Sequence, residues 1–369
     1  MPNLTADPIT SFTSEELSTE RPVISICIPT FNRCNCLRKL MENLVQLKNV
    51  HGPKLEICVS NNHSSDDTAK VIEKWRNQLD LKVLSQSENI GATLNAIAVT
   101  REATGTWLLI IGDDDELIEE GFAKLMAFLS IADVSEWILV GVADALGREF
   151  LLGDLVPGRY DAKSFRRVIL RTGLYRYGFI GMHVFSAIHL ENFLRLSPEQ
   201  ALPWPHLALF LRHFADGNFQ VFPSPVVKQA GGGAELFWNL GNWVRINLRK
   251  LNIIAGARTA IGDHRLFFNA LLVRELYSLR SAKELLLWKA LEPEDFYSQS
   301  FREHIERYRL LGFFEVVIVA HFIYMLLLYI TPTTMLLFTL RLSGKQNVIE
   351  KYISEKYAKK CFDGQMRGL

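Results

Sequence analysis

The sequence lacks the features of several large protein classes. It has only five cysteines among 369 residues, an odd number that suits reduced cytosolic thiols better than a disulfide framework. Its formal net charge is +1, so no global basic field is available to attract nucleic acid. The first twenty residues are polar and lack the basic start and apolar run of a signal peptide. We therefore expect a protein on the cytoplasmic side of the membrane, without a nucleic-acid partner.

Two common nucleotide-binding fingerprints are also missing. No G-x-G-x-x-G follows the first expected strand, and no G-x-x-x-x-G-K-[ST] occurs in the chain. Helical patterns nevertheless alternate with short apolar runs, which lie at residues 23–29, 55–60, 81–84 and 107–112. This alternation predicts an α/β fold whose parallel sheet is covered on both faces. Ligands bind such sheets beyond the carboxyl ends of the strands.

Three consecutive aspartates, Asp113, Asp114 and Asp115, follow the last of these runs. Two unit charges roughly 6 Å apart repel by about 3 kcal/mol at an effective dielectric of about 20. A divalent cation would remove this repulsion, and carboxylate oxygens are its preferred ligands. Taken alone, the three residues fit a solvated acidic turn equally well.

The ends of the expected strands carry a series of polar segments. They are Pro29-Thr30-Phe31-Asn32-Arg33, Ser60 to Thr68, Glu88 to Asn95, and Gly112 to Leu117. In this order and at these intervals, over residues 22–128, they resemble the family 2 glycosyltransferases, which have a GT-A nucleotide-sugar-binding fold. The resemblance implies an inverting transferase that uses Mg²⁺ or Mn²⁺.

The resemblance also implies roles for individual residues. It gives the following set for nucleotide-sugar binding: Pro29, Thr30, Asn32, Arg33, Asn61, Asn62, Asn89, Gly91, Asp113 and Asp114. It implies a metal ion on Asp115 and Asp113, with Asp115 also catalytic and Asp114 on the ribose; a one-residue shift would exchange these roles. Where the family commonly places an aspartate against the base, this chain has Asn61 or Asn62. An amide both donates and accepts hydrogen bonds whereas a carboxylate only accepts, so the identity of the base stays open.

The group that takes the acceptor's proton does not stand out in the sequence. The family has an E-D-like motif in its second half, and we find none here. The nearest equivalent by position is Pro203-Trp204-Pro205-His206, so we predict His206 as a catalytic base, with a helix-packing role as the alternative. The unperturbed histidine pKa of about 6.5 suits proton transfer near neutrality. The missing motif also leaves open a catalytically silent scaffold that binds nucleotide sugar or lipid glycan.

The composition divides the chain into three parts. We expect disorder over residues 1–20, a GT-A domain over 21–235 and a helical region over 236–369. Within the GT-A domain we expect a nucleotide-sugar half at 21–149 and an acceptor half at 150–235. The apolar segment of the helical region, 313–340, includes 25 residues from Val316 to Leu340 without Asp, Glu, Lys or Arg. That length permits a membrane crossing, although Pro332 would kink a helix; interfacial helices or a buried helix pair are the alternatives.

We expect the apolar segment to associate with the cytoplasmic face of the inner or plasma membrane. The G-D-D-D strand end and the helical tail also resemble those of abequosyltransferase-like O-antigen enzymes within the family. This likeness implies a cell-surface glycan acceptor, carried on a lipid, as the partner of the nucleotide-sugar donor.

Overall fold

The computed structural model describes residues 21–144, 147, 155–196, 204–229 and 240–276, with scattered helical positions between 289 and 330. The chain divides into two compact units, one made of residues up to 235 with 256–271, the other of 236–255 with residues beyond 272. The expected disordered start at 1–20, the glycine run at 231–233 and most of the apolar segment 313–340 lie outside the described residues.

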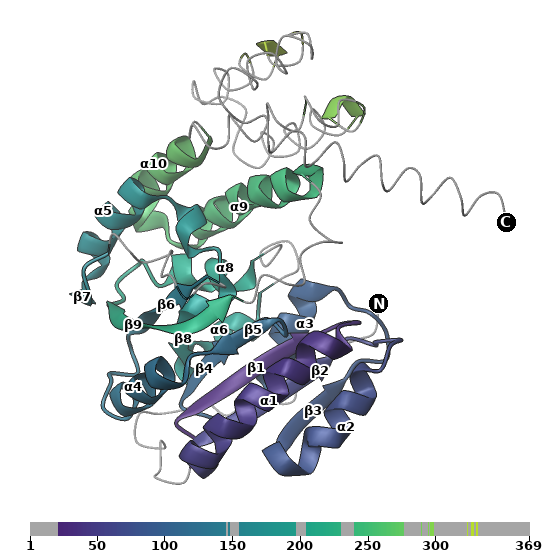
Figure 1. Cartoon of the computed structure of the whole chain (residues 1–369). Coiled ribbons are helices and arrows are strands. Elements are labelled where there is room, and N and C mark those ends of the chain that lie inside the picture. Colours follow the sequence, from purple (N-terminus) through teal and green to yellow (C-terminus); the bar gives the residue numbers. More distant parts are fainter. Residues whose placement is uncertain are drawn as a thin grey trace, which may run out of the picture. The chain divides into compact units, whose positions relative to one another are not determined.

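A nine-stranded sheet forms the centre of the first unit (Figure 1). Its order is β3-β2-β1-β4-β8-β6-β9-β5, and β7 pairs with β9. The first four strands along the chain are mutually parallel: β1 (Ile24–Thr30), β2 (Leu55–Asn61), β3 (Leu81–Ser85) and β4 (Trp107–Ile110). The prediction of a parallel α/β sheet is confirmed for this part.

The rest of the sheet, beyond the four runs for which parallel strands were predicted, is mixed. These strands are β5 (Asp115–Leu117), β6 (Trp137–Ala143), β7 (Gly158–Tyr160), β8 (His183–Ser186) and β9 (Phe219–Gln229). β8 runs antiparallel to both β4 and β6, while β6 and β9 are parallel.

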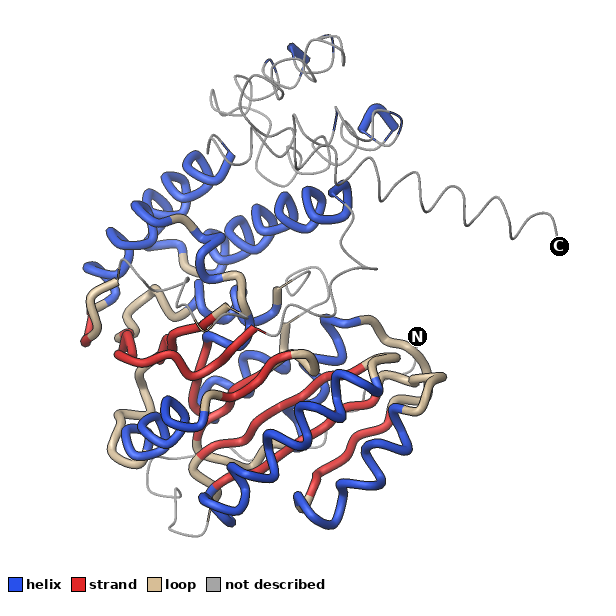
Figure 2. The backbone as a smooth tube through the Cα atoms, in the orientation of Figure 1, coloured by secondary structure: helices blue, strands red, loops and turns tan. Residues whose placement is uncertain are grey.

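The helices cover both faces of the sheet. Figure 2 shows α1 (Cys34–His51) and α2 (Thr68–Leu79) in front of β1 to β3, and they pack against each other. The buried positions of α1 are the expected ones at three- and four-residue steps: Leu37, Leu40, Met41, Leu44 and Leu47. On the other face α3 (Ala92–Ala98) packs against β1 and β2. α4 (Glu119–Leu129) packs against β9, and its Phe122 ring lies 5.5 Å from the ring of His51 at the end of α1.

The remaining helical elements come later in the chain. They are α5 (Ala162–Thr172), α6 (Leu190–Leu194), α8 (Pro205–Arg212), α9 (Leu240–Ala260) and α10 (Arg265–Leu276), with 3-10 turns that include η3 (Leu174–Tyr177) and η4 (Ile180–Met182). α9 and α10 are helical, as expected for this part of the region 236–369. Among the helices that the structure describes, none is both long and apolar enough to cross a bilayer.

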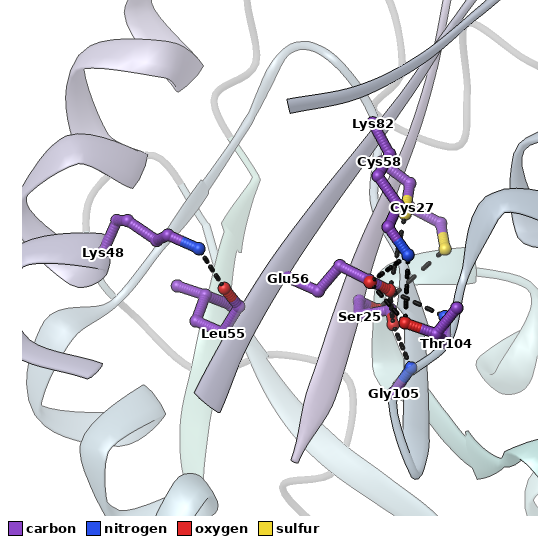
Figure 3. A network of polar contacts seen from close by, with 9 residues as sticks. All are labelled: Ser25, Cys27, Lys48, Leu55, Glu56, Cys58, Lys82, Thr104 and Gly105. Carbon is purple, nitrogen blue, oxygen red and sulfur yellow. Dashed lines mark hydrogen bonds and ion pairs between the residues drawn. The ribbon is translucent and has the colours of Figure 1, made fainter. Parts of the chain in front are cut away.

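A buried carboxylate ties the amino-terminal ends of the parallel strands together (Figure 3). Glu56 accepts hydrogen bonds from the Ser25 hydroxyl and from the Thr104 amide and hydroxyl, at 2.7 and 2.6 Å, and pairs with Lys82 at 2.6 Å. Burial opposes ionisation, but the bonds from Lys82, Ser25 and Thr104 hold the pKa of Glu56 below its ordinary value. This network fixes the sheet at the edge opposite the predicted ligand site.

Candidate functional site

The carboxyl ends of β1 and β4 meet at one edge of the sheet and carry a polar cluster. The Thr30 hydroxyl donates a hydrogen bond of 2.6 Å to Asp113 Oδ2. The Arg33 guanidinium lies 3.0 Å from Asp113 Oδ1 and 3.0 Å from Asp114 Oδ2. Four of the predicted residues are therefore joined directly, as expected for parallel strands that end at a common edge. The bond from Thr30 to Asp113 spans 83 positions of the sequence.

Burial differs among the three aspartates. Asp113 and Asp115 are 4% and 6% exposed, whereas the side chain of Asp114 is 28% exposed. Burial raises the pKa of Asp113, although the Thr30 hydroxyl and Arg33 oppose this rise. Burial and the charge of Asp114 raise the pKa of Asp115 to about 8. Below about pH 8 the Asp115 carboxyl therefore holds a proton in the folded chain.

Gly112 lets the aspartate carboxylates fold back over the turn. Its amide donates a hydrogen bond of 3.0 Å to Asp115 Oδ2. A Cβ at this position would lie 2.8 Å from Asp114 Oδ1 and 2.9 Å from Asp115 Oδ2, too close for either oxygen to stay in place. Asp115 begins β5 and pairs with Gln229, so its backbone is fixed by the sheet. Asp114 is the aspartate that presents most of its carboxylate to solvent.

The cluster fits a divalent cation in the nature of its donors and in its charge. Its oxygen donors are carboxylates, the ligands that Mg²⁺ and Mn²⁺ prefer. Burial and, after it, the charge of Asp114 raise the pKa of Asp115, and a bound cation would favour its ionised form. Within the part of the chain that the structure describes, no group of three or more His, Cys, Asp or Glu side chains is arranged to hold a metal alone. Asp115 and Asp113 are the residues that would hold such an ion.

The loops after β1 and β2 are bound to each other beside the aspartates. Asn32 has a left-handed backbone with φ 53°, which asparagine tolerates better than most residues. The Asn32 side-chain oxygen accepts a hydrogen bond from the Ser65 backbone amide at 2.7 Å, and the Asn32 backbone amide donates to the Ser64 hydroxyl at 3.0 Å. Asn61 accepts from the Ser64 amide at 3.0 Å. Asn32 therefore shapes this edge of the sheet by holding the loop after β1 against the loop after β2.

The third loop is anchored by a pair of asparagines. Asn62 donates to Asn89 at 2.9 Å and accepts from the Ile90 amide at 2.9 Å, so both halves of its amide are engaged within the protein. Asn89 also accepts from the Gly91 amide at 2.9 Å, and Gly91 adopts φ 84°, which favours glycine. Of the two candidates at the base position, Asn61 is the one with a side-chain N–H₂ that no hydrogen bond in the described part of the chain engages.

Other polar residues of this edge were not among the predicted site residues. The Ser60 hydroxyl donates to Asn95 Oδ1 at 2.6 Å, and Asn95 Nδ2 returns a bond to the Ser60 carbonyl at 3.1 Å. Pro29 lies opposite Ser60 in the β1–β2 pairing. The Asp66 carboxylate accepts from the Cys34 amide at 3.0 Å, at the start of α1. The sequence of α3 is mostly apolar, so the asparagine at position 95 was the available signal that this helix contributes a polar side chain to the edge.

His206 lies apart from this cluster, in an aromatic core. It is 1% exposed, its Nε2 lies 3.1 Å from the Gly178 carbonyl, and no hydrogen bond from the described residues reaches its Nδ1. The His206 and His183 rings are 4.8 Å apart. Burial, with His183 alongside, lowers the pKa of His206 well below its ordinary value. No hydrogen bond, ion pair or ring contact among the described residues joins His206 to the aspartates, and its burial favours the packing role.

Residues 25–135 match the family described as "Glycosyl transferase family 2". The chain is 36% identical over 115 residues to the abequosyltransferase RfbV of Salmonella typhimurium, a match that covers 30% of this chain and 34% of that protein. It is 34% identical over 107 residues to the GalNAc(5)-diNAcBac-PP-undecaprenol beta-1,3-glucosyltransferase of Campylobacter jejuni, with 28% and 34% covered. The segment that carries the aspartate cluster thus matches the family 2 glycosyltransferases, and the predicted resemblance is confirmed.

The fold extends the likeness beyond that segment. The crystal structure of Staphylococcus aureus TarS in complex with UDP superposes with a TM-score of 0.53 at 17% identity, covering 73% of this chain and 75% of that one. This likeness confirms a GT-A-like α/β fold with a mixed sheet. The matched segments make up about a third of the length of the curated relatives, 34% of each.

Proposed function

We propose that this chain is a glycosyltransferase that moves one sugar from a nucleotide-sugar donor to a cell-surface glycan, with inversion at the sugar carbon. One observation carries the proposal: Thr30, Arg33 and the three aspartates converge at the carboxyl edge of the sheet within the segment that matches the family. The names of the relatives support it, since they are transferases of abequose and of glucose.

The residues at the edge have separate tasks in this proposal. Thr30 and Arg33 hold Asp113 in one orientation, and Arg33 offsets part of the negative charge beside the donor. Asp114, the most exposed of the three, contacts the ribose, and Asn61 contacts the base. A divalent ion held by Asp115 and Asp113 would offset the charge that develops on the departing diphosphate.

We also propose that the apolar segment 313–340 binds the membrane surface, where a lipid-linked acceptor would be found. Residues Ile323, Leu326, Leu327 and Ile330 are helical and 41 to 71% exposed. Their three- and four-residue spacing places them on one helix face, which suits insertion into the interfacial region of a bilayer. The printed name of the Campylobacter relative, which contains undecaprenol, supports a lipid-linked acceptor.

A scaffold that binds nucleotide sugar without transferring it remains the second candidate, because the acidic motif of the family's acceptor half is missing. The two candidates differ in turnover. We expect the purified chain to release nucleoside diphosphate from one of the UDP, GDP, CDP or dTDP sugars when the lipid extract of its own host is added. Asp114→Asn should abolish that release, whereas the exposed-acid control Glu120→Gln should retain it. Binding of a nucleotide sugar with no release under any of these conditions would favour the scaffold.

A further inference from the structure

Asn43 is a polar residue on the side of α1 that packs against the sheet. Leu40 and Leu47, three residues before it and four after, are buried, as expected for the inward side of an amphipathic helix. Asparagine is also a poorer helix former than alanine. Neither packing nor helix stability therefore explains the residue at this position. Its side chain instead binds β5, the strand that begins with Asp115.

Both polar groups of the Asn43 side chain bind one residue of β5. Asn43 Nδ2 donates to the Leu117 carbonyl at 3.0 Å, and the Leu117 amide donates to Asn43 Oδ1 at 2.9 Å. The next residue, Ile118, donates instead to the Val226 carbonyl of β9 at 2.8 Å. β5 is the last strand in the sheet order, and the outer backbone groups of such a strand have no neighbouring strand to bind them. Asn43 supplies the two hydrogen bonds that a neighbouring strand would give.

The bonds to Leu117 also bear on Asp115. Side chains alternate along a strand, so Leu117 and Asp115 lie on the same face of β5, and both are buried. The residue between them, Glu116, lies on the other face and pairs with Lys228 of β9 at 3.1 Å. β5 has only three residues, so a contact that fixes Leu117 also limits how far the backbone of Asp115 can move.

The helix that carries Asn43 binds the aspartate segment at its other end as well. Arg33, which directly precedes α1, contacts Asp113 and Asp114. From residue 33 to residue 43 a helix advances about 15 Å, and the chain from residue 113 to residue 117 extends to at most about 14 Å. The two lengths match. α1 therefore holds the segment from Asp113 to Leu117 at both ends.

We propose that Asn43 is a positioning residue for binding of the nucleotide-sugar donor. Both polar groups of its side chain are engaged by Leu117, so Asn43 acts on the donor through the aspartates and not by contact. The bonds to Leu117 set the position of β5, and β5 sets the direction of the Asp115 carboxylate. The inference rests on the proposed function, because it assigns Asp115 to the donor site.

The test compares the full chain with the variants Asn43→Ala and Ser186→Ala. Asn43→Ala removes the bonds to Leu117 and keeps a good helix former in α1. Ser186→Ala is the control, because it removes one buried hydrogen bond, to the Val134 carbonyl, beside Trp107 at the end of β4 opposite the aspartates. UDP, GDP, CDP and dTDP are titrated in the presence of Mn²⁺. Residues that orient the ligands of a metal change its affinity roughly 10- to 100-fold, so we expect a loss of that size in Asn43→Ala and wild-type binding in Ser186→Ala.

Hydrogen exchange of the nucleotide-free protein gives a second measurement. The Asp115 amide donates to the Gly112 carbonyl, a bond to which Asn43 does not contribute. We expect faster exchange over residues 112–116 in Asn43→Ala than in wild type or Ser186→Ala, because the turn opens more often once β5 is released. The Leu117 amide is left out of the comparison, since it loses its partner directly.

The outcomes separate this inference from the proposed function. Equal nucleotide binding by the two variants would overturn the inference, as would wild-type exchange over residues 112–116 in Asn43→Ala. If wild type itself binds none of the four nucleotides, the proposed function fails. Exchange would then still decide the role of Asn43: faster exchange in Asn43→Ala alone would support its hold on the aspartate turn, and equal exchange in all three proteins would refute it.

Discussion

The Thr30 hydroxyl lies 2.6 Å from Asp113 Oδ2 and joins the end of β1 to the turn that follows β4. Asp113 is buried, and its other oxygen is bound by Arg33. The bond therefore satisfies an oxygen that water does not reach freely, and it fixes the first of the three aspartates. Unsatisfied buried acceptors are costly, so the contribution of this bond should be measurable.

Thr30→Val should destabilise the protein by about 1 to 3 kcal/mol, because Asp113 loses a partner while the shape of the side chain is kept. Thr30→Ser is the matched control, since it retains the hydroxyl and should stay close to wild type. Urea unfolding at neutral pH measures the difference. Equal stability of the Val and Ser variants would show that the bond contributes nothing.

The pH dependence of stability should report the burial of Asp115. Burial and Asp114 raise the pKa of Asp115 to about 8, whereas an unfolded aspartate has a pKa of about 3.9. Between these values the folded chain holds a proton that the unfolded chain has lost, so stability falls as pH rises, by up to about 1.4 kcal/mol per pH unit. Without divalent ions, Asp115→Asn should gain stability relative to wild type between pH 5 and pH 8, while the two should converge toward pH 4.

Manganese provides the control for this prediction. A cation on the aspartates would favour the ionised form, so Mn²⁺ should raise the unfolding temperature of wild type more at pH 8 than at pH 5 and should raise that of Asp115→Asn less. If the difference between variant and wild type is the same at pH 5 and pH 8, the Asp115 carboxyl titrates normally and the description of the site is wrong.

His206 should act in packing rather than in proton transfer. Burial lowers the pKa of its neighbour His183 to about 4, and the pKa of His206 is also well below its ordinary value. Unfolded histidines titrate near pH 6.5, so stability should be lost as pH falls from about 6.5 toward 4. His206→Gln keeps a donor for the Gly178 carbonyl and should lessen that loss while sugar transfer at neutral pH continues.

The same variant can support the opposite role. A His206→Gln protein with wild-type stability and donor binding, yet with greatly reduced turnover, would restore His206 as the catalytic base. A circular dichroism melt, a donor-binding titration and a transfer assay on one preparation are sufficient to decide between the two.

The parallel half of the fold was predictable because its signals are local. Apolar runs of strand length, the three- and four-residue spacing of Leu37 to Leu47, and polar residues at strand ends all lie within short windows. The antiparallel insertion of β8 was not, since His183 to Ser186 is a four-residue strand whose direction depends on pairing with distant β4 and β6.

The candidate site, like the fold, was predictable only in part. The convergence of Thr30, Arg33 and Asp113 followed from strand order alone, whereas the depth of each carboxylate depends on the fold of the turn around Gly112. His206 was chosen by its position in a motif. Its neighbours in α8, Leu207, Ala208, Leu209 and Phe210, are apolar on every side, and that pattern predicts a buried helix.

The central claim is that the carboxylates at this edge bind a nucleotide diphosphate together with a divalent ion. The most direct test is a thermal-shift panel of UDP, GDP, CDP and dTDP with and without Mn²⁺, run on wild type, Asp114→Asn and Glu120→Gln. We expect one nucleotide to stabilise wild type and Glu120→Gln only when Mn²⁺ is present, by roughly 2.7 kcal/mol at about 100 times its dissociation constant, and to have little effect on Asp114→Asn. A panel without any shift, or a shift that persists in Asp114→Asn and needs no metal, would contradict the account.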